Sequence, residues 1–178
     1  MKNILTIHIE DYYQVGAFSH LIPYQEWERF EDRIRRNTSS TLELLDETGT
    51  RATFFVSGWI AEKHADLLRN IVAAGHEIAA QGYYQHFIRN APPGVFRDDV
   101  RRTRQLIEQA VGHEVLGFRV GRGWIGPDNL WALDILEAEC FTYDSSICPI
   151  GRQFEHEPDR HTIHPAIGAK GTLLEIPV

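Results

Sequence analysis

The sequence predicts an α/β domain built on a parallel sheet, either open or closed into a barrel. Short segments rich in β-branched and aromatic residues alternate along the chain with longer segments that have the spacing of amphipathic helices. This strict alternation is typical of right-handed βαβ units, whose strands are parallel. A chain of 178 residues, 43% of them hydrophobic, has the size of one such domain.

The expected strands are short, apolar and bounded by turn residues or helices. They cover residues 4–9, 52–56, 77–80, 116–120 and 172–176. None of these apolar segments approaches the length of a membrane span, and the first follows the N-terminal residues without the apolar run of a signal peptide. We therefore expect a cytoplasmic protein without a membrane span.

The expected helices lie between the strands and place apolar residues on one face. They cover residues 37–48, 60–74, 95–111 and 128–139. Glycine follows the first three closely, as is common at helix C-termini, and Pro127 suits the start of the fourth. The stretch 151–170 combines Pro, Gly and charged residues without apolar rhythm, which predicts a long loop.

The charge and cysteine content exclude several classes of protein. The net charge of −7 comes from 25 acidic and 18 basic residues that are spread along the chain, which argues against nucleic acid or an anionic membrane as a partner. The two cysteines, Cys140 and Cys148, match no zinc or redox motif, so we expect small thiols that are buried or half-buried.

Four local patterns follow one another along nearly the whole chain. They are residues 6–14 (TIHIEDYYQ), 52–56 (ATFFV), 74–83 (AGHEIAAQGY), and 117–119 (GFR) followed by 143–146 (YDSS). Together they resemble the polysaccharide deacetylase family, also called the NodB-homology family, and in particular its branch beside exopolysaccharide and exosortase loci. The resemblance implies one NodB-homology domain over residues 1–178, folded as a distorted (β/α) barrel.

The same resemblance implies a reaction and a cofactor. The family reaction is hydrolysis of N-acetyl groups on a bacterial polysaccharide, so the implied partner is a polysaccharide or oligosaccharide with N-acetyl groups. A divalent, zinc-type ion at the strand ends is held by a carboxylate and two histidines, while an aspartate serves as general base and a later histidine as general acid. Such an ion polarises the carbonyl and makes its bound water acidic enough to attack.

This sequence departs from that pattern at the positions that carry the chemistry. His8 stands where the family has its base aspartate, and Gln81 and Gln85 stand where it has its histidine ligands. Because a carboxamide binds zinc-like ions weakly, we expect weak or absent metal and impaired activity. Glu10 is the preferred match for the metal carboxylate, since strand alternation puts it on the face of His8, and Asp11 is the neighbouring alternative.

Other positions at the implied active site are kept or missing. Arg119, which in the family steadies the base, is present, although Val-Gly-Arg follows it instead of the more common Ala-Pro-Ser. We assign His8, Asp11 and Arg119 to the catalytic positions. In the family, the strand near residues 175–178 precedes the segment with the general acid. We therefore expect the last barrel elements and the acid to be missing, and one sheet edge to be open to a protein partner.

Two alternative histidine sets have the composition of a metal site. His8, Glu10 and His86 would form a rearranged set of two histidines and one carboxylate. A second group in the long polar loop, for which a solvated loop is the simpler interpretation, comprises His156, His161 and His164. His76, alone at the start of a predicted strand, is interpreted as structural.

Aromatic residues near the strand ends suit either sugar stacking or core packing. They are Tyr12, Tyr13, Tyr83, Tyr84 and Trp124. Three function classes thus stay open: an active N-deacetylase, a pseudoenzyme that binds a glycan or a partner protein through the inherited cleft, and an inactivated or truncated copy. Deacetylase ancestry with impaired chemistry is the interpretation that the sequence favours.

Overall fold

A computed structural model describes residues 4–84, 88, 91–148, 162–166 and 173–178. Its strands form one sheet in the order β1-β2-β3-β4-β5-β7-β6. The bounds are β1 Thr6–His8, β2 Thr53–Val56, β3 Glu77–Ala80, β4 Gly117–Phe118, β5 Tyr143–Asp144, β6 His164–Pro165 and β7 Leu174–Glu175. All neighbours pair in parallel except β6, which is antiparallel to β7. The predicted α/β fold with a largely parallel sheet is confirmed.

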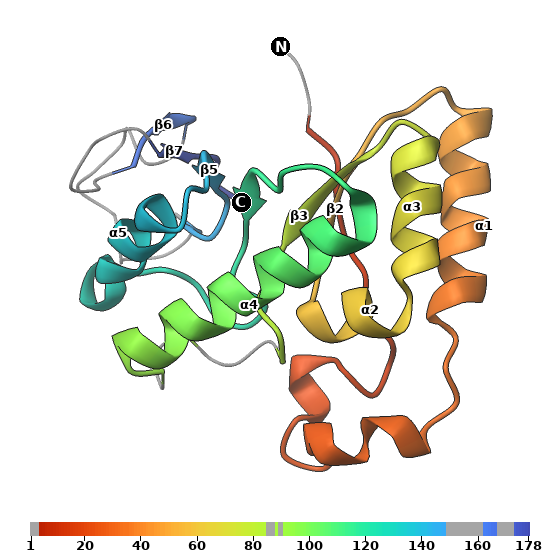
Figure 1. Cartoon of the computed structure of the whole chain (residues 1–178), viewed down its shortest axis with the longest axis horizontal. Coiled ribbons are helices and arrows are strands. Elements are labelled where there is room, and N and C mark those ends of the chain that lie inside the picture. Colours follow the sequence, from red (N-terminus) through yellow and green to blue (C-terminus); the bar gives the residue numbers. More distant parts are fainter. Residues whose placement is uncertain (1–3, 85–87, 89–90, 149–161, 167–172) are drawn as a thin grey trace.

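The helices surround the outside of the sheet (Figure 1). The α-helices are α1 Ile34–Glu47, α2 Gly58–Lys63, α3 Ala65–Ala73, α4 Pro93–Val111 and α5 Trp131–Ala138, and the 3-10 helices are η1 Gly16–Phe18, η2 Tyr24–Arg29 and η4 Pro127–Asn129. Their inner sides pack on alternate strand residues such as Phe54, Ile78 and Phe118, which are at most 2% exposed. Burial of these large apolar side chains is the main stabilising contribution.

Several elements differ from the expectation. The predicted helix 60–74 is two helices, because His64 has non-helical backbone angles (φ −131°, ψ 41°) between α2 and α3. The strand β6 lies within the predicted loop 151–170, most of which falls outside the described residues. Sequence periodicity also missed η1, η2 and β5, which are too short to show a period.

The sheet is strongly curved, so side chains of distant strands meet on its inner face. Tyr143 of β5 donates a hydrogen bond from its hydroxyl to Glu77 of β3 (2.9 Å), across the intervening β4. Gly117 of β4 permits this crossing, because a Cβ there would lie 1.9 Å from the Tyr143 ring. A cavity of about 130 Å³ on this face is lined from β1, β2, β3 and β5 and by Ile176. The sheet order ends at β1 and β6 among the described strands, and closure into a barrel stays a prediction.

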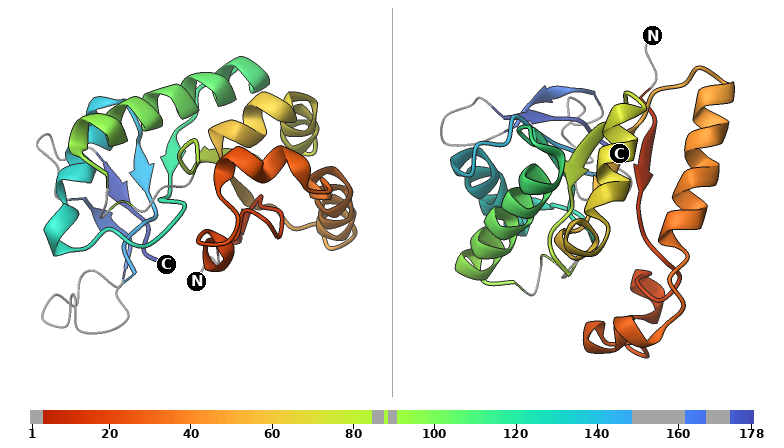
Figure 2. Two further views of the ribbon diagram at one scale, coloured as in Figure 1. Left: turned by 90° about the horizontal axis from the view of Figure 1, so that it is seen from below. Right: turned by 45° about the vertical axis from the view of Figure 1, so that its right-hand side comes forward.

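A long excursion, residues 11–33, leaves the sheet after β1 and returns at α1. Figure 2 shows this segment, in orange-red, beyond the end of β1 and beside α2. Its inner side chains, including Tyr13 and Trp27, are at most 2% exposed and pack against Trp59. The excursion therefore forms a packed segment next to the carboxyl ends of the strands.

Two predictions about chain chemistry have direct outcomes. Cys140 and Cys148 are both free thiols, and Cys148 is half-buried as expected, but Cys140 is exposed, so the expectation for its burial was wrong. In the part of the chain that the structure describes, no helix combines the length and apolarity needed to cross a membrane.

Candidate functional site

The candidate site lies at the carboxyl ends of the parallel strands. Glu10 follows β1, Gln81 follows β3 and Arg119 follows β4, so the sheet brings them to one edge. Ala80 pairs with Phe118, and Phe118 pairs with Asp144, which puts Gln81, Arg119 and Ser145 at matching positions on neighbouring strands. Neighbouring strands are about 4.8 Å apart, so these residues form one layer across the sheet. In parallel α/β folds this edge carries the functional site.

Arg119 is the best anchored side chain of this layer. Its Nε donates to the Ser145 carbonyl (2.8 Å), its Nη2 donates to the Ser145 hydroxyl (2.6 Å), and its Nη1 donates to the Thr6 hydroxyl (2.9 Å). The guanidinium also lies 4.2 Å from the centre of the Phe55 ring. Burial lowers the pKa of Arg119, while the carboxyl group of Asp144 opposes that shift. These contacts fix the orientation of the cation.

His8 occupies the position that faces this cation. The Nη1 of Arg119 lies 3.2 Å from the Nε2 of His8. Because arginine can only donate, Nε2 must accept, and the proton of the neutral ring then belongs on Nδ1. Nδ1 lies 3.5 Å from the Glu10 carboxylate. The His8 lone pair is therefore used by Arg119 and is not free to take a proton from water or to bind a metal.

Asp11 has a structural environment. Only 3% exposed, its carboxylate accepts hydrogen bonds from the backbone N–H groups of Tyr12 (2.8 Å) and Arg33 (2.6 Å). The Arg33 guanidinium lies 3.4 Å from the same carboxylate, and the Asp11 N–H donates to Gln14 (2.9 Å). Asp11 thus joins the two ends of the excursion 11–33. Both carboxylate oxygens are used in this way, and the catalytic position that the sequence assigned to Asp11 stays a prediction.

Gln81 is fully buried, and its backbone N–H donates to the Val56 carbonyl (3.0 Å). Within the described residues, neither Nε2 nor Oε1 of its side chain has a hydrogen-bond partner. The next residue, Gly82, has a φ of +80°, and a Cβ there would lie 2.8 Å from the Asp99 carboxylate. That carboxylate accepts from the Tyr83 N–H at 3.0 Å. Glycine is therefore required for the turn that sets Gln81 in place.

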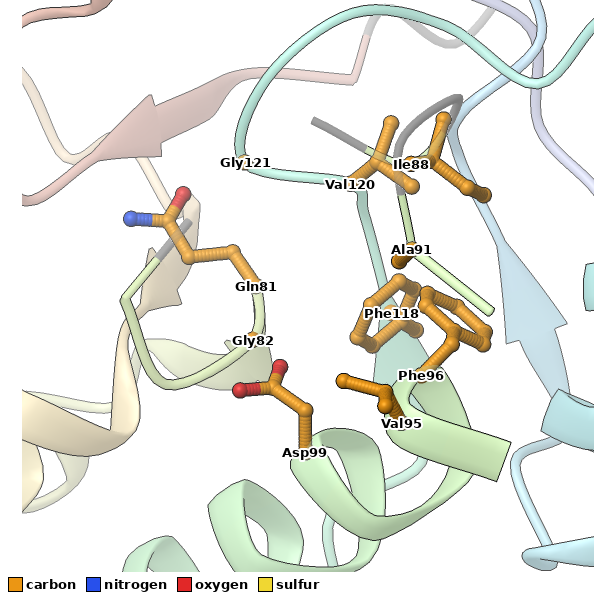
Figure 3. A pocket seen from close by; sticks show the side chains of 10 residues that line it. All are labelled: Gln81, Gly82, Ile88, Ala91, Val95, Phe96, Asp99, Phe118, Val120 and Gly121. Atoms are coloured by element: carbon orange, nitrogen blue, oxygen red, sulfur yellow. The ribbon is translucent and has the colours of Figure 1, made fainter. Parts of the chain in front are cut away.

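A small cavity of about 20 Å³ borders this turn (Figure 3). Figure 3 shows apolar side chains on its far side, including Phe96, Phe118 and Val120, and shows the Gln81 amide pointing away from them. The two other predicted ligand positions, Gln85 and His86, lie outside the described residues. The structure therefore leaves the set of His8, Glu10 and His86 untested, together with His156 and His161 of the long loop.

The described residues do not fit a zinc-type ion. Among them, no group of three or more His, Cys, Asp or Glu side chains could hold a metal. At the expected centre, the donor atom of His8 is engaged by Arg119 and Gln81 offers a neutral amide. Three ligands with nitrogen or carboxylate donors are the usual minimum for catalytic zinc.

The aromatic candidates divide between packing and exposure. Tyr13 and Tyr83 are at most 5% exposed, and burial raises the pKa of both hydroxyls, so they are core residues. Tyr12 and Trp124 are 36% and 47% exposed, and the Arg33 guanidinium lies over the Tyr12 ring, 4.0 Å from its centre. Tyr84 stacks on Tyr24 with ring centres 4.1 Å apart.

The structure agrees with the sequence analysis on His76 and adds two hydrogen-bond partners of Arg119. His76 is buried, which lowers its pKa, and lies 3.4 Å from the Ala52 N–H, in agreement with a structural role. Sequence reasoning missed Ser145 and Thr6 as partners of Arg119, although the YDSS motif was a signal for Ser145.

Comparison with known proteins gives consistent relatives. The sequence shares 27% identity over 99 residues with a chitooligosaccharide deacetylase of Bradyrhizobium sp. (strain ANU 289), covering 56% of this chain and 43% of that protein. A crystal structure from Mycobacterium smegmatis, described as a polysaccharide deacetylase, superposes with a TM-score of 0.75 at 23% identity, over 98% of this chain and 57% of that chain. A CE4 family pseudoenzyme from Bacillus anthracis superposes with a TM-score of 0.59 at 19% identity, over 78% and 40%.

The chain thus spans about half the length of these relatives. The two solved structures share its fold at identities below 25%. The family model described as "Polysaccharide deacetylase" matches residues 28–139, which is more than half of the sequence. On this evidence the chain belongs to the polysaccharide deacetylase family.

Proposed function

We propose that this chain is a polysaccharide deacetylase-like domain that binds N-acetylated polysaccharide or oligosaccharide and has impaired hydrolytic chemistry. The observation that carries the proposal is the 3.2 Å contact between Arg119 Nη1 and His8 Nε2. A general base needs a free lone pair within reach of water, and this contact removes it.

The remaining groups of the layer support the same conclusion. Hydrolysis of an acetamide requires a polarised carbonyl and an activated water. Gln81 is uncharged, Asp11 is used by the backbone of the excursion, and Glu10 lies near the protonated nitrogen of His8. With His8 engaged by Arg119 and Asp11 engaged by the excursion, we expect only a small rate enhancement.

Binding of a glycan is supported by family membership and by an exposed aromatic group. The curated relative is a chitooligosaccharide deacetylase, and we propose an N-acetylated oligosaccharide as ligand of this chain as well. The partly exposed ring of Trp124 offers apolar surface of the kind that stacks on sugar rings. The resemblance to the exopolysaccharide-associated branch suggests a bacterial exopolysaccharide as the natural polymer.

The proposal is tested by three measurements on the purified chain. Elemental analysis after purification without chelators should give well under one divalent ion per chain. Acetate release from N-acetylated chitooligosaccharides should stay near background, while calorimetry with the same oligosaccharide should show binding. Stoichiometric metal with measurable turnover would refute impaired chemistry and support the rearranged set of His8, Glu10 and His86. Absence of glycan binding would refute the binding function.

A protein partner at an open sheet edge is a second candidate. The observation that favours it lies just before β1, the first strand of the sheet order, where Ile4 and Leu5 are 54% and 42% exposed. Exposed apolar residues beside an edge strand suit pairing with another chain. Size measurement by light scattering, alone and with a candidate partner, tests it.

A further inference from the structure

Gln81 lies in the layer of strand-end residues with its side chain inside the protein. Glu77 lies four residues earlier, on β3, and faces the inner side of the curved sheet. There its carboxylate accepts hydrogen bonds from the hydroxyl groups of Thr53 and Tyr143. Alternation along β3 puts Gln81 on that same inner side. Arg119, at the matching position on β4, also faces inward, as its bond to Thr6 shows. Gln81 therefore turns its amide toward the inner side of the sheet, the side on which Arg119 also lies.

The charged neighbours of Gln81 are already satisfied within the described residues. Arg119 donates through all three of its nitrogens to Ser145, Thr6 and His8. Asp99 accepts from the Tyr83 N–H. In contrast, both polar atoms of the fully buried Gln81 amide lack a partner among the described residues. Buried amides are normally hydrogen-bonded, so such a group indicates a ligand or water.

The chemistry of a carboxamide defines the complementary ligand. Nε2 needs an acceptor, and Oε1 needs a donor. An acetamido group is trans, so its C=O and N–H point in opposite directions and one side chain can bond only one of them. An N-acetylated pyranose offers the acetamido carbonyl as acceptor and a hydroxyl on the neighbouring carbon as donor. A de-N-acetylated sugar lacks that carbonyl and carries an ammonium group, which cannot accept from Nε2.

We propose that Gln81 binds the acetamido carbonyl of an N-acetylated sugar directly through Nε2, without a bridging metal ion, while Oε1 accepts from the neighbouring hydroxyl. This inference rests on the proposed glycan binding and deepens it, because it names the recognised group. The side chain at this predicted ligand position thereby becomes a contact that distinguishes acetylated from free-amino sugar.

The experiment compares the whole chain with two variants in the presence of EDTA. Gln81→Met keeps the length of the side chain and removes both hydrogen-bonding atoms. Gln109→Met, on the exposed face of α4, is the matched control. Calorimetry measures the affinity of each protein for chitotetraose and for its fully de-N-acetylated counterpart. Thermal unfolding measures the stability of each variant, and Gln81→Met should unfold no earlier than the parent, because the buried amide has no described partner to lose.

We expect the parent chain to bind chitotetraose in EDTA about tenfold more tightly than the free-amino oligomer. The affinity of Gln81→Met for chitotetraose should be about tenfold lower than that of the parent, which corresponds to the loss of one buried hydrogen bond. Gln109→Met should bind like the parent. Equal binding by Gln81→Met and parent, or loss of parent binding in EDTA, would overturn the inference and leave glycan binding itself standing. A parent chain that binds no N-acetylated oligosaccharide with or without EDTA would overturn both.

Discussion

The guanidinium of Arg119 donates to the imidazole of His8 across 3.2 Å, at the point where β1 and β4 end. An aspartate at position 8 would meet the same cation as a charged pair. With histidine there, Arg119 instead donates to the lone pair on Nε2 of a neutral ring and thereby fixes its tautomer. The residue type at the end of β1 therefore decides what this arrangement of sheet and arginine is able to do.

Restoring the metal ligands should restore metal binding. In the variant with His8→Asp, Gln81→His and Gln85→His, two imidazoles and Glu10 complete a three-ligand site that leaves room for water. Each single change should do little, since the ligands of one metal act as a unit. Activity should return less fully than binding, because the resemblance predicts that the general acid is missing. Zinc affinity is measured by competition with a chromogenic chelator. Equal, weak binding by parent and triple variant would show that the positions of Gln81 and Gln85 were misassigned.

The buried carboxyl pair Asp144 and Glu175 should make stability depend on pH. The two lie opposite each other on β5 and β7, and both are fully buried. Burial raises the pKa of Asp144 to about 6, although its hydrogen bonds with Glu175 and Ser146 oppose that shift. The pKa of Asp144 is thus higher in the folded than in the unfolded state, so its protonated carboxyl group stabilises the fold below about pH 4. This contribution to the free energy of unfolding is lost as the pH rises to about 6. We expect a loss of roughly 2–3 kcal/mol in the free energy of unfolding over this range.

The control for that pH dependence is Asp144→Asn, which removes the titrating group and keeps its size. Urea unfolding at several pH values between 4 and 7 should give a flatter profile for the variant than for the parent. Asp66→Asn, an exposed carboxylate paired with Arg35, is the matched surface change and should leave the slope near that of the parent. An unchanged slope in Asp144→Asn would mean that other groups cause the pH dependence.

Removing the carboxylate of Asp11 should destabilise the excursion 11–33. Asp11→Ala leaves the Arg33 N–H and guanidinium without their buried acceptor, which costs roughly 2–4 kcal/mol in the free energy of unfolding. Limited proteolysis should cut within the excursion sooner than in the parent. Glu26→Ala, which removes an exposed ion pair with Arg29, should change stability by less than about 0.5 kcal/mol. A stable, protease-resistant Asp11→Ala would refute the structural role of this residue.

The crossing of Tyr143 over β4 should make Gly117 intolerant of a side chain. Gly117→Ala puts a Cβ 1.9 Å from the Tyr143 ring, so we expect a loss of about 2–4 kcal/mol. Gly94→Ala is the control, since a Cβ there meets nothing within 4 Å and alanine favours the helix α4 by about 0.5–1 kcal/mol. Chemical denaturation measures both. The double variant Gly117→Ala/Tyr143→Ala removes the clash, so it should be more stable than the sum of the two single losses in the free energy of unfolding predicts. If the two losses simply add, the clash is not the cause.

The sequence by itself determined the α/β class and the family. Hydrophobic periodicity located the strands around 53–56 and 77–80 and the helix that ends at residue 111, because each is regular and ends at a glycine or a turn. The family patterns identified His8 and Gln81 as departures from residue identity alone, and the loss of a base and a ligand at these positions stays a prediction. Short elements such as β5 and β6, with two residues each, carry no period and escaped detection.

Only the tertiary structure decided how those residues are used. Thr6, His8, Arg119 and Ser145 are separated by up to 139 positions in the chain, and the curvature of the sheet brings them into one hydrogen-bonded group. Glu10 and Asp11 are neighbours in sequence, yet one lies near the His8 ring and the other joins the ends of the excursion. Strand alternation and the path of the chain after β1 separate their roles, because adjacent side chains on an extended backbone point to opposite sides.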